Sequence, residues 1–245
     1  MPVPLFGALA FTLILAACGS QPLPTAAFVL HEAQTAKITD LSFTAAGTFA
    51  SSLGATLNGQ SSGGSDLTFQ ASLTGKITMS PQRADLALSL GQGQDVAIEI
   101  ITDATTQIGY VRIPALDQAG AAQWISLPLG DLGSYLDTSI FTNFEHVTQA
   151  KMVGPDTING TAVYHLQGKQ QLQQGTGSAT EDFYVRQDNA YPVRVVIQGS
   201  VSVPDATGSG TATGPAASSD VTIDFTGVNT GAAITLPSGS QLAND

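Results

Sequence analysis

The chain has 245 residues, of which only 11% are charged, and its formal net charge is −11 at pH 7. Its eight Lys and Arg residues are scattered singly, which argues against nucleic-acid binding and against electrostatic binding of the folded part to anionic headgroups. The only cysteine is Cys18, which excludes disulfides within the chain and cysteine-rich metal sites.

The N-terminal segment has the pattern of a bacterial lipoprotein signal peptide. The first two dozen residues contain no Lys, Arg, Asp or Glu, and an apolar run with two interruptions extends from Leu5 to Ala17. That length suits a signal-peptide core and falls short of the about 20 residues needed to span a bilayer. Residues 15–19 read Leu-Ala-Ala-Cys-Gly, which looks like a lipobox. This pattern predicts cleavage before Cys18 and lipid on its thiol.

The lipobox divides the chain into a signal peptide (1–17), a lipidated tether (18–24) and a single folded domain (25–245). A mature bacterial lipoprotein carries two or three acyl chains, palmitate among them, and these anchor it stably. We therefore expect the protein on the extracytoplasmic face of the cell membrane, held by its lipid anchor. An ordinary secretory signal that contains a cysteine, or a buried N-terminal helix, remains the alternative.

The first element after the tether is a predicted helix from Thr25 to about Lys37. Thr25 offers a side-chain oxygen as the N-cap. Apolar residues follow at helical spacing and form one stripe. The stripe consists of Ala26, Val29, Leu30 and Ala33. This pattern predicts a helix that packs on a sheet.

From Asp40 onward the apolar residues alternate with polar ones, which is typical of strands with one buried face. The alternating segments are 41–45, 67–73, 77–79, 84–90, 96–100, 108–113, 123–127, 146–153, 161–168, 180–186, 192–203 and 219–225. Turn signals separate them, and Asn159-Gly160 is typical of a type I′ hairpin turn. Short strands with tight connections predict an antiparallel meander.

A second helix is predicted over residues 131–142, with Asp131 as its cap. Its apolar face is broader than a surface helix requires. The face comprises Leu132, Tyr135, Leu136, Ile140, Phe141 and Phe144.

Patterns that carry catalytic or metal chemistry are weak in this sequence. The three histidines stand on separate segments without metal-ligand spacing, and His165 is expected on the polar face of a strand. The adjacent acidic residues Glu181 and Asp182 belong to one predicted strand, so they point to opposite faces. We therefore expect no enzyme activity, no cofactor and no metal.

Several stretches in a fixed order resemble the LolA-like lipoproteins, in particular the mycobacterial lipid-carrying lipoproteins of the LppX and LprG type. The matching stretches are 29–33, 41–43, 124–128, 153–160, 164–168, 183–185, 191–195 and 223–229. Tyr184 stands where the family commonly has Trp. The identity of the ligand does not transfer with the resemblance.

The resemblance implies an α+β fold that is mostly β: a strongly curved antiparallel sheet, or half-open β-barrel, with helices covering its concave face and an apolar cavity between. Together with the apolar face of the second helix and the strand before it, this predicts a lipid cavity. The predicted lining residues are Trp124, Leu127, Leu132, Leu136, Ile140 and Phe141. The implied function is binding and transport of lipid or acylated molecules in the cell envelope. The alternative is a sensor or structural lipoprotein that binds a protein partner.

Overall fold

A computed structural model describes residues 22–52, 56–57, 60–61, 66–91, 96–117, 123–130, 148–171, 176–202 and 216–242. The signal peptide, Cys18 and the predicted helix 131–142 lie outside these residues. Within the described residues, no helix has both the length and the apolar character needed to cross a membrane.

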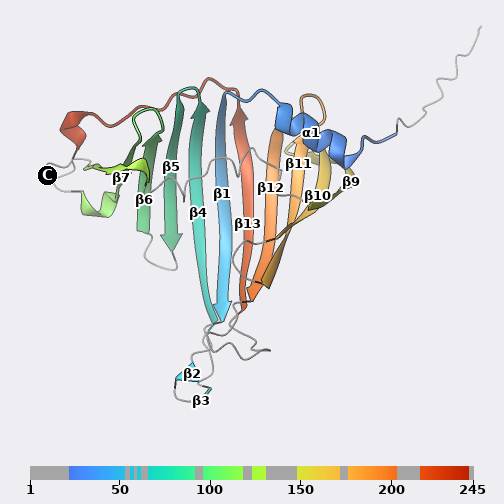
Figure 1. Cartoon of the computed structure of the whole chain (residues 1–245), viewed down its shortest axis with the longest axis horizontal. Coiled ribbons are helices and arrows are strands. Elements are labelled where there is room, and N and C mark those ends of the chain that lie inside the picture. Colours follow the sequence, from blue (N-terminus) through green and yellow to red (C-terminus); the bar gives the residue numbers. More distant parts are fainter. Residues whose placement is uncertain are drawn as a thin grey trace, which may run out of the picture.

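The described residues form one complete α-helix, two short 3₁₀ helices and thirteen strands (Figure 1). The helices are α1 (Ala26–Thr35), η1 (Pro114–Leu116) and η4 (Gly239–Gln241). The strands of the first half are β1 (Asp40–Ser52), β2 (Thr56–Leu57), β3 (Gln60–Ser61), β4 (Asp66–Met79), β5 (Gln82–Gly91), β6 (Val96–Asp103), β7 (Ile108–Arg112) and β8 (Ile125–Pro128). Those of the second half are β9 (Thr148–Ile158), β10 (Thr161–Gln171), β11 (Thr176–Arg186), β12 (Pro192–Ser202) and β13 (Ala216–Val228).

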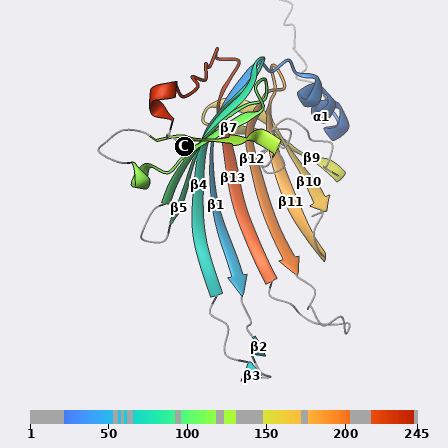
Figure 2. The ribbon, with the colours of Figure 1, turned by 60° about the vertical axis from the view of Figure 1, so that its left-hand side comes forward.

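Eleven strands form one antiparallel sheet in the order β8-β7-β6-β5-β4-β1-β13-β12-β11-β10-β9. Strand β1 lies at the centre and joins two meanders, because it pairs with β4 on one side and with β13 on the other. The sheet is not closed: β8 and β9 form its two edges. Figure 2 shows that the strands bow along their length. The prediction of a mostly β protein built on an open antiparallel sheet is confirmed.

Helix α1 confirms the predicted first helix and packs against one end of the β9–β12 half of the sheet (Figure 1). The backbone N–H of Phe28 donates to Thr25 Oγ1 at 3.2 Å, as expected for an N-cap. The predicted stripe is buried in one cluster with strand residues. The cluster comprises Ala26, Val29, Leu30, Ala33, Leu166, Phe183, Val185 and Val195. Among the described residues this is the only complete α-helix, so the cover of a concave face by several helices stays a prediction.

Two further clusters complete the core. The central cluster comprises Leu41, Phe43, Ile77, Ala84 and Leu86, from β1, β4 and β5. The third cluster lies at the β6 end of the sheet, where Ile101 and Trp124 meet Ile234 of the C-terminal segment. Ile101 pairs with Asp85 and Ile100 with Leu86, so the third cluster lies on the face of the sheet opposite the central cluster.

Gly75 of β4 makes room for the ring of Phe43 in the central cluster. A Cβ atom at position 75 would lie 2.4 Å from Phe43 Cζ and 2.8 Å from Leu86 Cδ2. Phe43 is only 1% exposed, so its ring has no open space into which to move. Glycine weakens an isolated strand, but here its missing side chain allows the two strands to pack.

The Gly75→Ala substitution is expected to lower the free energy of unfolding by roughly 1 to 3 kcal/mol, because the added methyl group overpacks the central cluster. Urea unfolding followed by circular dichroism measures the change. Gly239→Ala is the matched control, since a Cβ at position 239 meets nothing within 4 Å. Equal stability of the two variants would contradict the packing role of Gly75.

Asp40, at the start of β1, fixes the C-terminal segment after β13. Its carboxylate accepts hydrogen bonds from the backbone N–H of Thr230 at 2.8 Å, from Thr230 Oγ1 at 3.0 Å and from the N–H of Gly231 at 3.1 Å. The residue is 4% exposed. The segment then runs along the strand ends to Trp124, whose N–H donates to the carbonyl oxygen of Gln241 at 2.8 Å. This connection ties the centre of the sheet to its β8 edge.

Candidate functional site

Over most of the sheet one face is apolar and the other polar, because successive side chains of a strand point to opposite sides. On β1, Leu41, Phe43 and Ala45 lie on the face that we call the apolar face. Ser42 and Thr44 lie on the other, the polar face. The antiparallel register extends both faces across the neighbouring strands.

The register arranges the apolar face in rows that run across the strands. The first row is Phe225, Phe43, Gly75, Leu86 and Ile100. The second row is Ile223, Ala45, Leu73, Leu88 and Ile98. The third row is Val221, Gly47, Ala71, Leu90 and Val96, and the fourth is Phe49 and Phe69. We call the second, third and fourth rows the lower rows.

Exposure increases from the first row to the last. Phe43 and Leu86 of the first row are 1% and 7% exposed, whereas Val96 of the third row and Phe69 of the fourth are 47% and 48% exposed. The Phe69 ring stacks on Phe49 with 4.9 Å between the ring centroids. The hydrophobic core therefore continues, without a change of residue type, into a surface that is partly open to solvent.

The lower rows can shield a hydrocarbon chain from water. Their side chains are Leu, Ile, Val, Phe and Ala, with a glycine at Gly47 where the backbone itself is the surface. Burial of apolar area contributes about 0.8 kcal/mol per CH₂ group, so a long acyl chain gains affinity on such a face without any directional contact.

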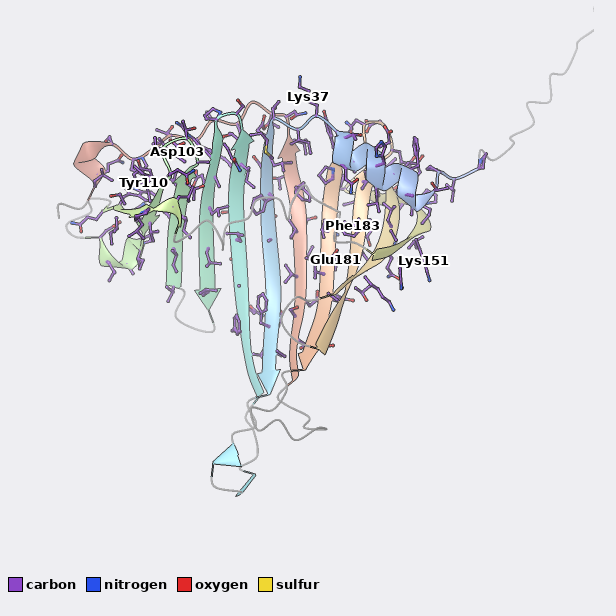
Figure 3. The ribbon with its side chains drawn as sticks, viewed as in Figure 1. Lys37, Asp103, Tyr110, Lys151, Glu181 and Phe183 are labelled. Carbon is purple, nitrogen blue, oxygen red and sulfur yellow. The ribbon has the colours of Figure 1, made fainter. Side chains whose placement is uncertain are left out.

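One carboxyl group lies within this apolar pattern. Glu181 of β11 pairs with Ile197 of β12, which pairs with Val221, so Glu181 continues the third row. It is 6% exposed, and Figure 3 shows it on β11 below Phe183, which lies under α1. Asp182 points to the polar face, as predicted for adjacent residues of a strand. Glu181 alternates in phase with the buried residues Ala179 and Phe183, and this spacing is the sequence signal for a buried carboxyl.

The polar face is organised by ion pairs and ring contacts. Arg194 Nε donates to Asp224 Oδ1 at 2.6 Å, and this hydrogen bond raises the pKa of Arg194. His165 Nε2 lies 2.7 Å from Asp182 Oδ1, and its ring stacks on Tyr184 at 4.5 Å. The expected polar-face position of His165 is confirmed. These contacts link β10 to β11 and β12 to β13.

Two hollows of about 530 and 700 Å³ also lie on the polar face, and Thr48 and Asp220 border both. Hydroxyl and amide side chains from the neighbouring strands line them, including Gln70, Ser72 and Gln198. Such walls suit water and polar ligands and offer little to a hydrocarbon chain. The apolar face is therefore the better candidate for an acyl-binding surface, although the hollows lie on the polar face.

The described part of the predicted lipid cavity is divided between two environments. Trp124 is 7% exposed and packs on Ile101 and Ile234, which places its ring in the core. Leu127 of β8 is 39% exposed and pairs with Gly109 of β7. The other four predicted cavity residues, and the anchor Cys18, lie outside the described residues. Those four are Leu132, Leu136, Ile140 and Phe141, and their cavity role stays a prediction.

No family model and no curated protein sequence matches the chain. Among solved structures, LprF from Mycobacterium bovis is similar over 87% of this chain and 97% of its own, with 16% identity and a TM-score of 0.52. The lipoprotein LppX from Mycobacterium tuberculosis is 12% identical over 85% of this chain and 99% of its own, with a TM-score of 0.48. The chain therefore has the fold of LprF, and the resemblance to the mycobacterial LolA-like lipoproteins is confirmed at the level of the fold.

Proposed function

We propose that this protein is a membrane-anchored lipoprotein that binds lipid or acylated molecules and carries or chaperones them in the cell envelope. The observation that carries the proposal is the set of lower rows, which continue the core but remain partly exposed. A sheet face that needed only to be stable would be covered or polar. The lipobox around Cys18 supports the anchor and the extracytoplasmic location.

Binding of an acyl chain to the lower rows is tested by replacing two exposed apolar residues with glutamine, one inside the lower rows and one outside them. Phe69→Gln removes a ring from the fourth row and is expected to weaken binding of a fluorescent fatty acid about fivefold, since part of the ring's burial is lost. Leu116→Gln is the control, because Leu116 is 69% exposed on η1 and lies outside the lower rows. Titration of the purified protein, followed by fluorescence, gives both dissociation constants.

Two outcomes would contradict the proposal. Equal weakening by Phe69→Gln and Leu116→Gln would show that the lower rows are not the binding surface. A protein that shows no bound lipid by native mass spectrometry, and takes up none when lipid is offered, would favour the alternative function. In that case the chain is a sensor or structural lipoprotein that uses the same fold to bind a protein partner.

A further inference from the structure

Helix α1 carries an exposed aromatic residue on the side opposite its buried stripe. Phe28 is 56% exposed, while Ala26, Val29 and Leu30 are each at most 9% exposed. A helix that packs on a sheet needs only one apolar stripe, so the packing does not explain Phe28. Its ring borders a small pocket of about 190 Å³ between α1 and the turn after β11. A second exposed apolar side chain, Leu23 at 52%, lies just before the helix.

Single exposed apolar residues are common on soluble proteins and by themselves carry no function. Leu23 and Phe28, however, lie close in the chain to the predicted lipid anchor, Cys18. Pro22, the first described residue, stands only four positions after Cys18, and four residues span at most about 14 Å when fully extended. If Cys18 carries the lipid, as the proposed function holds, the chain just before α1 stays within that distance of the bilayer surface.

The charge on α1 itself favours an apolar contact over an electrostatic one. The helix contains no Lys or Arg, its only acidic residue is Glu32, and the chain as a whole is acidic. Basic residues that usually attract anionic headgroups are therefore missing from the helix. A short tether compensates, because it keeps the two exposed side chains at high effective concentration next to the lipid.

We propose that the side chains of Leu23 and Phe28 insert into the surface of the bilayer in which Cys18 is anchored. The outward side of α1 then lies on the membrane surface. This inference rests on the proposed lipid anchor. It adds an orientation: the α1 end of the sheet contacts the membrane, whereas η1, at the opposite edge of the sheet, stays away from it (Figure 1).

Tryptophan fluorescence with brominated lipids tests this orientation. In a Trp124→Phe background, Phe28→Trp is compared with Leu116→Trp, since Leu116 is 69% exposed on η1. The natively lipidated proteins are reconstituted into phosphatidylcholine vesicles with and without brominated phosphatidylcholine. Interfacial side chains reach about 5–10 Å into the headgroup region, so we expect quenching roughly twofold stronger at position 28 than at position 116. Leu23→Trp gives a second probe that lies outside the helix.

The possible results distinguish a wrong membrane orientation from a wrong lipid anchor. Flotation with the vesicles together with stronger quenching at positions 28 and 23 supports the inference. Flotation with equal quenching at positions 28, 23 and 116 overturns it and leaves the anchor intact. Failure of the wild-type protein to float overturns the lipid anchor, and the inference falls with it.

Discussion

Replacement of Asp40 by alanine is expected to lower the free energy of unfolding by roughly 1.5 to 3 kcal/mol, because the hydrogen bonds of three donors to a buried, charged acceptor are lost. The donors are the N–H and hydroxyl of Thr230 and the N–H of Gly231. The C-terminal segment would lose its attachment to β1, and with it the packing of Ile234 on Trp124. Urea unfolding at pH 7 measures the effect. Asp188→Ala is the control, since Asp188 lies exposed in the turn between β11 and β12 and is expected to change stability little.

The contribution of Asp40 to the free energy of unfolding also depends on pH. Burial raises the pKa of this carboxyl, but the hydrogen bonds from Thr230 and Gly231 outweigh burial, so its pKa lies below the ordinary value of 3.8. Because its pKa is lower in the folded state, ionised Asp40 contributes its full stabilisation at any pH above its unfolded-state pKa, which is near 3.9. This stabilisation is lost as the pH falls through the folded-state pKa. Wild type should therefore lose stability more steeply below about pH 4 than Asp40→Ala. If the free energy of unfolding falls equally steeply with decreasing pH in both proteins, the pKa of Asp40 is not lowered in the folded state.

Conversion of Cys18 to serine is expected to abolish lipid attachment completely and to leave an unprocessed precursor. The thiol is the lipid acceptor in the proposed anchor, and lipidation normally precedes cleavage of the signal peptide. Metabolic labelling with a clickable fatty acid should mark the wild-type protein and leave the variant unlabelled.

The control for this experiment is Ser20→Ala, which lies next to the lipobox and leaves it intact. It should be labelled and processed like the wild-type protein. Undiminished fatty-acid label on Cys18→Ser would remove the anchor assignment and the membrane location that depends on it.

Local sequence patterns predicted the elements of this fold well because the relevant physics is local. The N-cap and stripe of α1 follow from a spacing of 3.6 residues, and the alternation along each strand follows from a spacing of two. Asn159 and Gly160 adopt positive φ angles of 49° and 80°, as a type I′ turn requires. The opposite directions of Glu181 and Asp182 follow from the same alternation.

Long-range pairing could not be predicted in the same way. Strands β1 and β13 pair although Phe43 and Phe225 are far apart in the chain, and only the resemblance pointed to such a sheet. Segments 67–73 and 77–79 form one strand, β4, because Gly75 makes room for Phe43 instead of ending the strand. Trp124 was predicted beside the second helix, which lies outside the described residues, and local patterns gave no sign of its contact with Ile234, more than a hundred residues later.

The partial exposure of the lower rows could not be predicted from the sequence either. Alternation identified residues such as Leu73, Leu88 and Phe69 as the buried face of their strands, but the degree of exposure along each strand depends on what covers it. The candidate site is therefore a property of the assembled sheet. Four of the six predicted cavity residues came instead from the apolar pattern of the helix predicted at 131–142, and Trp124 and Leu127 came from the strand before it.

The long strands separate the two ends of the apolar face. From Ile77 to Phe69 the chain advances eight residues along β4, which is about 26 Å at the rise of a strand. Helix α1 lies at the end of the sheet where β4 finishes (Figure 1), whereas Phe69 belongs to the part of β4 near its start. If α1 rests on the anchoring bilayer, a ligand on the lower rows is held well beyond the headgroup layer. Such a carrier can exchange cargo with an acceptor on its far side while its own anchor stays in place.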